Sequence, residues 1–478
     1  MNSVTILLSV VFVPTAGAFL LPVIGRFSER LRNYAAFVFV AISFIGAAII
    51  ARPIIGGDSI IVDYGLPLGF NFVLRADCLA VFMAMVSSFI GAIIVLFSFD
   101  YISHYDSRNE YYLMVVLFLG AMMGLVFSAN LILLFIFWEI TAITSWRLIG
   151  FFREKEHVFR ADKAFLVTVF GALAMLLGFI IIREEAGSFD LAVIKEYFMI
   201  TPIPNVAVFL ILLGILSKSA TLPFHTWLPD AGVAPSPVTA LLHAAVLVKI
   251  GVYVFARLFI ATFSYDAVWG TIIPWIAASS ALVSAGAALV DTDIKRIIAY
   301  STVSQIGFII LGFAVGNAIG VAGALLFILM HGLAKGGLFL CAGIIEQNTK
   351  TKDITRMGGL ISTMPVTAIA FLACSFSIMG VPPFGGFFSK YMVFSGTVSS
   401  GQTMLALTFL AGSIMTILYL FRLFNFVFLG NANAPAREGS KLMVASVVVL
   451  AALSLAFGLY IAYPSALVHA AVKQMLGT

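Results

Sequence analysis

The amino-acid sequence predicts an all-α integral membrane protein, and two observations lead to this fold class. First, its 478 residues are 62% hydrophobic and only 10% charged, with a mean hydropathy of +1.11, whereas roughly a quarter of the residues in soluble domains are charged. Second, apolar stretches of about 20 residues, long enough to cross roughly 30 Å of hydrocarbon, recur along the whole chain. The short loops between them leave no room for a soluble catalytic domain, and we expect no nucleic-acid partner.

We expect about fourteen transmembrane helices in one polytopic domain that covers residues 1–478, with the seventh and twelfth helices broken. The expected spans lie near 3–25, 33–51, 77–102, 111–128, 130–151, 163–182, 205–223, 236–259, 268–290, 297–316, 318–345, 362–393, 402–429 and 441–463. Residues 58–75 are rich in β-forming residues interrupted by Gly and Pro, which predicts a small exposed hairpin.

The basic residues are distributed unequally between the two sets of loops. Loops after odd-numbered helices contain Arg26, Arg30, Arg32, Arg108, Arg153, Lys155, Arg160, Lys163, Lys295, Arg296, Lys350, Lys352, Arg356, Arg422, Arg437 and Lys441. The other loops and the termini contain only Arg52, Arg75, Arg183, Lys195, Arg257 and Lys473. Because cytoplasmic loops carry the excess of Lys and Arg, we expect both termini on the outer side of the membrane.

A few charged residues and histidines fall inside the apolar spans, where a charge costs roughly 3 kcal/mol or more and usually has a function. They are Glu139, Lys218, His243, Lys249, His331, Lys335 and Lys390. A lysine near a helix end can instead extend its ammonium group to the membrane surface. That explanation suits one isolated lysine better than four lysines, two histidines and a glutamate that lie mostly deep in their spans.

The chemistry of these residues follows from burial. A desolvated lysine loses affinity for its proton, and a nearby carboxylate restores that affinity. Lys218 would therefore hold its proton with Glu139 in reach and release it when Glu139 moves away. Histidine suits intermediate positions because its unperturbed pKa lies near neutrality. The pattern predicts a proton relay.

Two spans are interrupted in a matching way. Lys218 is followed by prolines at 223 and 229, and the glycines and prolines of residues 380–386 precede Lys390. Such breaks are tolerated only where they line a cavity or are buried in protein, and paired broken helices indicate an ion site at a repeat interface. The two breaks lie five helices apart, and an odd offset reverses direction across the membrane, as an inverted repeat requires.

At these residues the chain resembles the antiporter-like subunits shared by respiratory complex I, membrane-bound hydrogenases and Mrp-type sodium/proton antiporters. The segment 217–231 around Lys218 is the most specific match, and Glu139 after Phe-Trp is similar to the family's fifth-helix glutamate. The other matching segments are 241–249 in the eighth helix, 331–335 in the eleventh, 382–390 in the twelfth, and the loop 291–302.

The resemblance implies two inverted five-helix repeats, helices 4–8 (about 111–259) and helices 9–13 (about 268–429). It also implies roles for the buried residues. Glu139 and Lys218 would form a switching pair, Lys390 would be the exit-side carrier, and the connectors would be His243, Lys249 and Lys335, with His331 beside Lys335 on one helix face.

Three features qualify the resemblance. The chain stops at Thr478 without the long lateral helix of the largest members, which favours a middle-type subunit. Lysine at 390 disfavours the complex I type that has glutamate there. Arg147 stands where relatives more often show an apolar residue, so it is an auxiliary candidate, although an arginine at a helix end that reaches the interface explains it better. His225, in the first break, is a second auxiliary candidate.

Several functions stay open on the sequence. The first is a proton-translocating subunit of a complex I-like oxidoreductase or hydrogenase, and the second is a subunit of an Mrp-type sodium/proton antiporter without a redox partner. A transporter that works alone is a weaker alternative. A polytopic haem enzyme with His243 and His331 as axial ligands is remote, because it leaves the four lysines unexplained.

The sequence offers no catalytic chemistry of its own. We expect no cofactor and no metal site in this chain, and its three cysteines (Cys78, Cys341 and Cys374) lack the paired spacing of a redox or zinc motif. The expected partners are other membrane subunits, including further antiporter-like ones, together with lipid and protons, with sodium as an open alternative. The expected location is a bacterial or archaeal cytoplasmic membrane.

Overall fold

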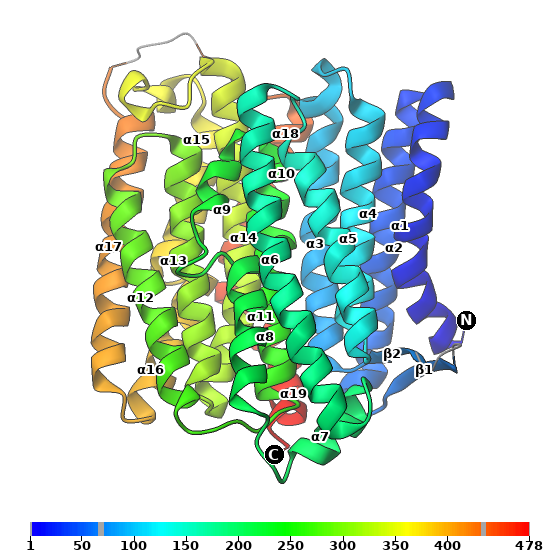
Figure 1. Ribbon diagram of the computed structural model, residues 1–478. Helices are drawn as coiled ribbons and strands as arrows, with labels where there is room; N and C mark the ends of the chain where they lie inside the picture. Colours follow the sequence, from blue (N-terminus) through cyan, green and yellow to red (C-terminus); the bar gives the residue numbers. More distant parts are fainter. Residues whose placement is uncertain (1, 66–70, 432–435, 478) are drawn as a thin grey trace.

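The computed structural model describes residues 2–65, 71–431 and 436–477, and these form a bundle of roughly parallel and antiparallel helices (Figure 1). Twelve helical segments in these ranges are long and apolar enough to cross a membrane. Eleven of them are single helices: α1 (Ser3–Phe27), α2 (Glu29–Ile55), α3 (Cys78–Tyr101), α4 (Arg108–Phe127), α5 (Leu131–Ile149), α6 (Lys155–Ala186), α12 (Trp269–Val290), α13 (Ile294–Ala314), α14 (Ala318–Thr349), α17 (Thr403–Phe428) and α18 (Lys441–Leu459).

The twelfth long segment is composite. It consists of α10 (Ser236–Ala240) and α11 (Leu247–Phe255), joined by a π-helical turn over Leu241–Ala245, and a second π-helical turn follows over Ala256–Ile260. Widened turns of this kind are rare and often occur at functional sites. The sequence predicted this span as a plain helix, because a π turn leaves hydropathy unchanged.

The two predicted breaks are present. The seventh span consists of α8 (Asn205–Lys218) and the short α9 (Trp227–Asp230), and the twelfth consists of α15 (Pro365–Met379) and α16 (Gly385–Ser399). With the twelve long segments they complete the fourteen predicted spans, as far as the described residues go. Helix α6 starts eight residues before the predicted 163, because its first turns are charged and do not register as apolar.

The predicted hairpin is also confirmed. Strands β1 (Ile60–Gly65) and β2 (Asn71–Ala76) pair antiparallel, with Ile60 opposite Ala76. Two helices outside the predicted spans, α7 (Leu191–Phe198) and α19 (Ala462–Leu476), lie at the same end of the bundle as the hairpin and both termini (Figure 1). We call this end the hairpin face.

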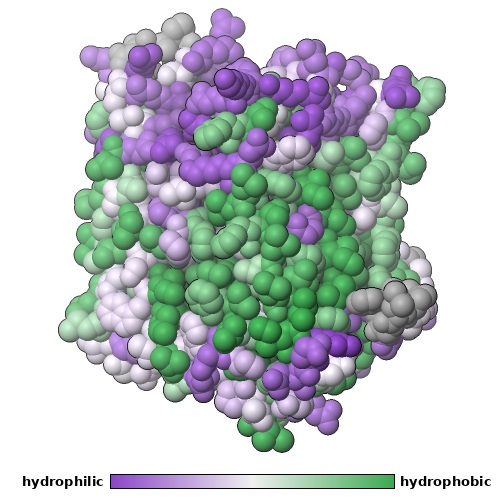
Figure 2. All heavy atoms as spheres, in the orientation of Figure 1, coloured by the Kyte–Doolittle hydropathy of each residue, from purple (hydrophilic) through white to green (hydrophobic). Residues whose placement is uncertain are grey.

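The opposite end, here called the basic face, carries the loops that follow odd-numbered spans. Ion pairs link these loops, such as Arg108 with Glu29 at 2.6 Å and Lys163 with Asp230 at 2.7 Å. The middle of the visible surface is predominantly hydrophobic, and hydrophilic residues gather densely along the upper edge (Figure 2). This banding is the surface that a protein embedded in a bilayer presents.

The interior of the bundle is organised around α14, whose most apolar stretch is entirely buried, as is that of the α10–α11 span. The outer helices α1, α2, α6, α12 and α17 expose large apolar side chains on their outward sides. A polar side chain on α14 is therefore surrounded by protein, so the helices packed around it must provide its polar contacts.

The second break requires a glycine where it packs on its own first half. Gly380 has a φ of +82°, and a Cβ built on Gly386 would lie 1.8 Å from the carbonyl oxygen of Ser377. Real Cβ atoms do not approach backbone this closely, so α16 can start against the end of α15 only because residue 386 lacks a side chain.

We predict that Gly386→Ala destabilises the protein by about 1–3 kcal/mol, because the added methyl group forces the two half-helices apart. Thermal denaturation of the purified protein in detergent measures the effect. Gly286→Ala on α12 is the matched control, since its Cβ would meet Met415 at an ordinary 3.6 Å. Equal denaturation temperatures for the two variants would show that the break does not depend on this contact.

Candidate functional site

The centre of the site is the first break, where α8 ends at Lys218. The backbone carbonyls released there are satisfied inside the protein: the indole nitrogen of Trp227 donates to Ser217 O at 3.0 Å, and Thr221 N donates to Leu216 O at 2.9 Å. The break is thus a hydrogen-bonded structure buried in protein, as an interruption at membrane depth must be.

Lys218 is fully buried and points at helix α5. Its Nζ donates a hydrogen bond to the carbonyl oxygen of Trp138 at 3.1 Å and lies 5.2 Å from the centre of the Trp138 ring. A cation over an indole face is stabilised by the ring's quadrupole. The lysine is therefore held by a neutral carbonyl and an aromatic ring.

Glu139 is the next residue along α5 and lies within electrostatic range of Lys218. One of its carboxylate oxygens, Oε1, is buried and has no hydrogen-bond partner. In the part of the chain that the structure describes, no ion pair of 4.0 Å or less joins the two residues. The structure thus makes Glu139 and Lys218 neighbours without a closed ion pair.

Three further predicted residues meet between α11 and α14. Nζ of Lys249 lies 2.5 Å from Nδ1 of His331 and 3.5 Å from the carbonyl oxygen of His243, a residue in the π-helical turn. The ring of His243 packs on Phe339 with centroids 4.3 Å apart, and neither of its nitrogens has a hydrogen-bond partner. All three side chains are fully buried, so the two helices place one cation beside two titratable rings.

Lys335 lies one turn beyond His331 on α14 and faces α13. Its Nζ donates to Ser301 Oγ at 2.6 Å and to the carbonyl oxygen of Ile298 at 3.1 Å. Ser301 shares a hydrogen bond of 2.6 Å with the hydroxyl of Tyr419 on α17. The polar contacts of Lys335 therefore continue away from α14 toward the outer helices.

Lys390 follows the second break on α16. Its side chain is buried, its Nζ has no hydrogen-bond partner, and the ring centre of Phe308 on α13 is 5.7 Å away. Lys335 and Lys390 lie within electrostatic range of one another. The second break thus places a lysine in an aromatic surrounding similar to that of Lys218 beside Trp138.

The two auxiliary candidates lie apart from this row. Arg147 forms an ion pair with Glu110 of α4, and Arg153 joins the same carboxylate at 2.5 Å, so Arg147 contacts a surface acid at the end of α5. His225 lies inside the first break, half-buried, with Nδ1 unpartnered and Lys163 within electrostatic range.

The sequence analysis overlooked a row of buried polar residues on α13. Ser304 Oγ and Gln305 Oε1 are buried without a partner, while Gln305 Nε2 donates to Thr416 of α17 at 3.3 Å. The run Ser-Thr-Val-Ser-Gln over residues 301–305 inside an apolar span was the available signal. Neutral residues attract less attention than charges, although a buried hydroxyl also needs a partner.

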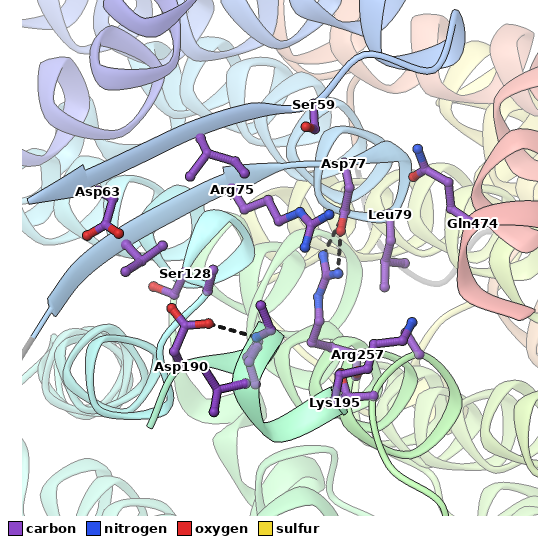
Figure 3. Close-up of a pocket in the computed structure, with 18 of the residues that line it drawn as sticks. Ser59, Asp63, Arg75, Asp77, Leu79, Ser128, Asp190, Lys195, Arg257 and Gln474 are labelled. Atoms are coloured by element: carbon purple, nitrogen blue, oxygen red, sulfur yellow. Dashed lines mark hydrogen bonds and ion pairs between the residues drawn. The ribbon is translucent and has the colours of Figure 1, made fainter. Parts of the chain in front are cut away.

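A cavity of about 690 Å³ opens on the hairpin face between β2, α7 and the second π-helical turn (Figure 3). At its inner wall Arg257 donates two hydrogen bonds to Asp77, at 2.5 and 2.8 Å, and its Nε donates to the hydroxyl of Tyr253 at 3.0 Å. Lys249, Tyr253 and Arg257 are spaced by four residues on α11 and the turn that follows, so they share one helix face.

The Asp77–Arg257 pair is largely buried, with 18% and 12% of the side chains exposed. Burial opposes ionisation of Asp77, but the charge of Arg257 and the hydrogen bonds outweigh it, so the pKa of this carboxyl lies below its usual value. The pair therefore stays ionised at neutral pH and joins the start of α3 to the end of the α10–α11 span.

Fourteen spans, two broken helices and a row of buried lysines define an antiporter-like membrane protein. Residues 128–416 match the family described as NADH:quinone oxidoreductase/Mrp antiporter, TM, and the chain belongs to that family. The resemblance drawn from the sequence is confirmed.

The similar curated proteins are large subunits of Na(+)/H(+) antiporters. The chain is 34% identical to one such protein of Alkalihalophilus pseudofirmus strain OF4 over 93% of its own length. It is 31% identical to one of Staphylococcus aureus strain Newman over 94% of its length. The chain spans about 60% of the length of these relatives.

Two solved structures share the fold over nearly their whole lengths. A chain of the Mrp complex from Dietzia sp. DQ12-45-1b superposes with a TM-score of 0.89 at 21% identity, covering 100% of this chain and 98% of that chain. A chain of the membrane-bound sulfane sulfur reductase, an archaeal respiratory membrane complex, gives 0.90 at 23% identity, with coverage of 98% and 97%. Both belong to multi-subunit membrane complexes.

We predict that Asp77→Ala destabilises the protein by roughly 3–5 kcal/mol, because it leaves Arg257 buried without its partner. Since the folded pKa of Asp77 is depressed, the contribution of the pair is complete above about pH 4, the pKa of an unfolded aspartate. It is lost as the pH falls through the folded pKa. Denaturation in detergent at several pH values measures both effects.

Asp63→Ala provides the control, because Asp63 lines the same cavity but is exposed. A surface substitution of this kind changes stability by roughly 0.5 kcal/mol or less. If the two alanine variants denature alike at neutral pH, the Asp77–Arg257 pair does not stabilise the fold.

Proposed function

We propose that this chain is the ion-translocating subunit of a multi-subunit membrane antiporter complex, and that protons move along its buried row of charged residues. The observation that carries the proposal is Lys218: a fully buried ammonium group, placed by a helix break, beside a carboxylate with which it forms no closed ion pair. A purely structural ion pair has no reason to be left open in this way.

The distance between Glu139 and Lys218 controls the proton affinity of the lysine. At an effective dielectric constant of 20, two unit charges attract by about 4 kcal/mol at 4 Å and by about 2 kcal/mol at 8 Å. A movement of a few ångströms therefore changes the proton affinity of Lys218 by more than tenfold. Closing the pair retains the proton, and opening it favours release toward the next acceptor.

The next acceptors are the groups between α11 and α14. The neutral ring of His331 can take a proton on one nitrogen and give one from the other, and its Nδ1 already contacts Lys249. In this scheme Lys249, His243 and Lys335 connect the switching pair to the second half of the chain. Lys390, at the second break, is the exit-side carrier. The two halves, about 111–259 and about 268–429, would be inverted repeats.

Two host complexes are compatible with this path. The relatives at 31–34% identity are sodium/proton antiporter subunits, which favours an Mrp-type complex that exchanges protons for sodium. The fold shared with the sulfane sulfur reductase supports the alternative, a subunit of a redox-driven complex. In either case we propose that this chain holds no cofactor of its own and that any redox centres lie in other chains.

We further propose a bacterial or archaeal cytoplasmic membrane as the location, with the basic face in the cytoplasm and both termini outside. The support is the excess of Lys and Arg in the loops after odd-numbered spans. The proposed partners are other membrane subunits, including further antiporter-like ones.

We predict that Lys218→Ala and Glu139→Gln each lower proton flux at least tenfold in vesicles that contain the whole complex. The first removes the proton carrier and the second removes the charge that controls it. Flux is driven in turn by a sodium gradient and by a reductant. Loss under the sodium gradient alone identifies the antiporter complex, and loss under the reductant identifies the redox-driven one.

Glu29→Gln is the control for loss of a carboxylate, because Glu29 pairs with Arg108 at the basic face on α2. It should keep flux within about twofold of the unaltered complex. Unchanged flux in the Lys218 and Glu139 variants under both drives would mean that the buried pair is structural, and the proposal would fail.

A further inference from the structure

A second buried ion pair lies at the basic face and is not part of the relay described above. Lys295, at the start of α13, is 1% exposed, and its Nζ lies 2.5 Å from Oε2 of Glu346 on α14. The same Nζ donates to the carbonyl oxygen of Ala234 at 3.1 Å. Glu346 remains 22% exposed, so this pair has one buried member and one that water can reach.

Outside the pair, polar groups lead to the surface. A recess of about 470 Å³ on the basic face is lined by residues that include Tyr105 and Gln347. The side-chain amide of Gln347 donates to the carbonyl oxygen of Tyr101 at 3.3 Å, and the Tyr101 hydroxyl donates to Ser236 Oγ at 3.4 Å. Ser236 Oγ in turn donates to Oε2 of Glu346 at 3.3 Å.

Inside the pair, polar side chains continue along the α10–α11 span. Thr239, one turn beyond Ser236, donates to the carbonyl oxygen of Ser236 at 2.9 Å. His243 follows after another turn, fully buried, with both ring nitrogens unpartnered. Helix α14 packs closely here, because a Cβ on Gly343 would lie 2.5 Å from that of Ser236. One helix face thus carries hydroxyls from the Glu346 carboxylate to a buried imidazole.

We propose that Glu346 is the group through which protons pass between the basic face and the relay, by way of Ser236 and Thr239 to His243. This inference rests on the proposed function. A proton from water in the recess binds Oε2 of Glu346 and breaks its ion pair with Lys295. The proton then moves through the two hydroxyls and intervening water to a ring nitrogen of His243, and the restored carboxylate pairs with Lys295 again.

The alternative is that Lys295 and Glu346 only clamp α13 to α14. A clamp accounts for the 2.5 Å contact, but it does not account for the hydroxyls that continue from this carboxylate or for the two unpartnered nitrogens of His243. An unsatisfied buried polar group costs roughly 1–3 kcal/mol, and water reaching it from Glu346 would remove that cost.

The first test measures proton flux in vesicles that contain the complete complex with Glu346→Gln or Glu346→Asp. Glutamine can still accept a hydrogen bond from Lys295 but binds no proton, so flux should fall at least tenfold while the complex assembles. Aspartate should restore at least a third of the flux. Equal flux in the Gln variant and in the Glu29→Gln control would overturn the proposal.

The second test measures water access and does not depend on flux. Thr239→Cys in the assembled complex is treated with a water-soluble thiol reagent from the side of the basic face. We expect it to react at least tenfold faster than Ser88→Cys, a buried α3 position whose hydroxyl bonds to Ala84 O. The native cysteines are buried and set the background in the unaltered complex. Equal rates for the two variants would refute a water path.

The outcomes separate this inference from the proposed function. If Lys218→Ala abolishes flux and Glu346→Gln does not, the relay stands and access through Glu346 is wrong. If neither variant changes flux, the proposed function itself fails. If Glu346→Gln prevents assembly, the labelling rate of Thr239→Cys alone decides for or against the water path.

Discussion

The structure depends on one constraint: it must hold several lysine ammonium groups inside a membrane bundle. An ion moved out of water into such an interior costs several kcal/mol even after the protein relaxes. Among the described residues, Lys295 has a carboxylate within 4.0 Å, whereas Lys218, Lys249, Lys335 and Lys390 are held without an ion pair. The fold must therefore supply other acceptors.

Three of these lysines are bound by backbone carbonyl oxygens, those of Trp138, His243 and Ile298. Carbonyl groups carry no net charge, so they stabilise the ammonium without fixing its proton as a permanent carboxylate partner would. This is the condition under which a lysine can both hold and release a proton. The helix breaks and the π-helical turn contribute directly, because they place Lys218, Lys390 and the His243 carbonyl inside the bundle.

The α10–α11 span connects the two faces of the molecule. Its polar residues run from Ser236 at the basic face, past His243 and Lys249, to Arg257 at the cavity of the hairpin face. The two ends differ in chemistry. At the basic face a glutamate reachable by water meets a buried lysine, and at the hairpin face a bidentate Asp77–Arg257 pair is fully satisfied. Because arginine keeps its proton at any physiological pH, the second end is suited to closing the span.

The spans, both breaks, the hairpin and the buried charged residues could be predicted from the sequence, because each depends on the composition of one continuous segment. Lys218 is recognisable as a cation within an apolar run, and the breaks as prolines and glycines within such runs. Which side chains meet became known only from the packed fold. Lys295 and Glu346 look like ordinary charges at span ends, and Arg147 has Glu110 as its partner, on another helix. Contacts between helices depend on how each helix is rotated and packed, and hydropathy along one segment carries no information about that rotation.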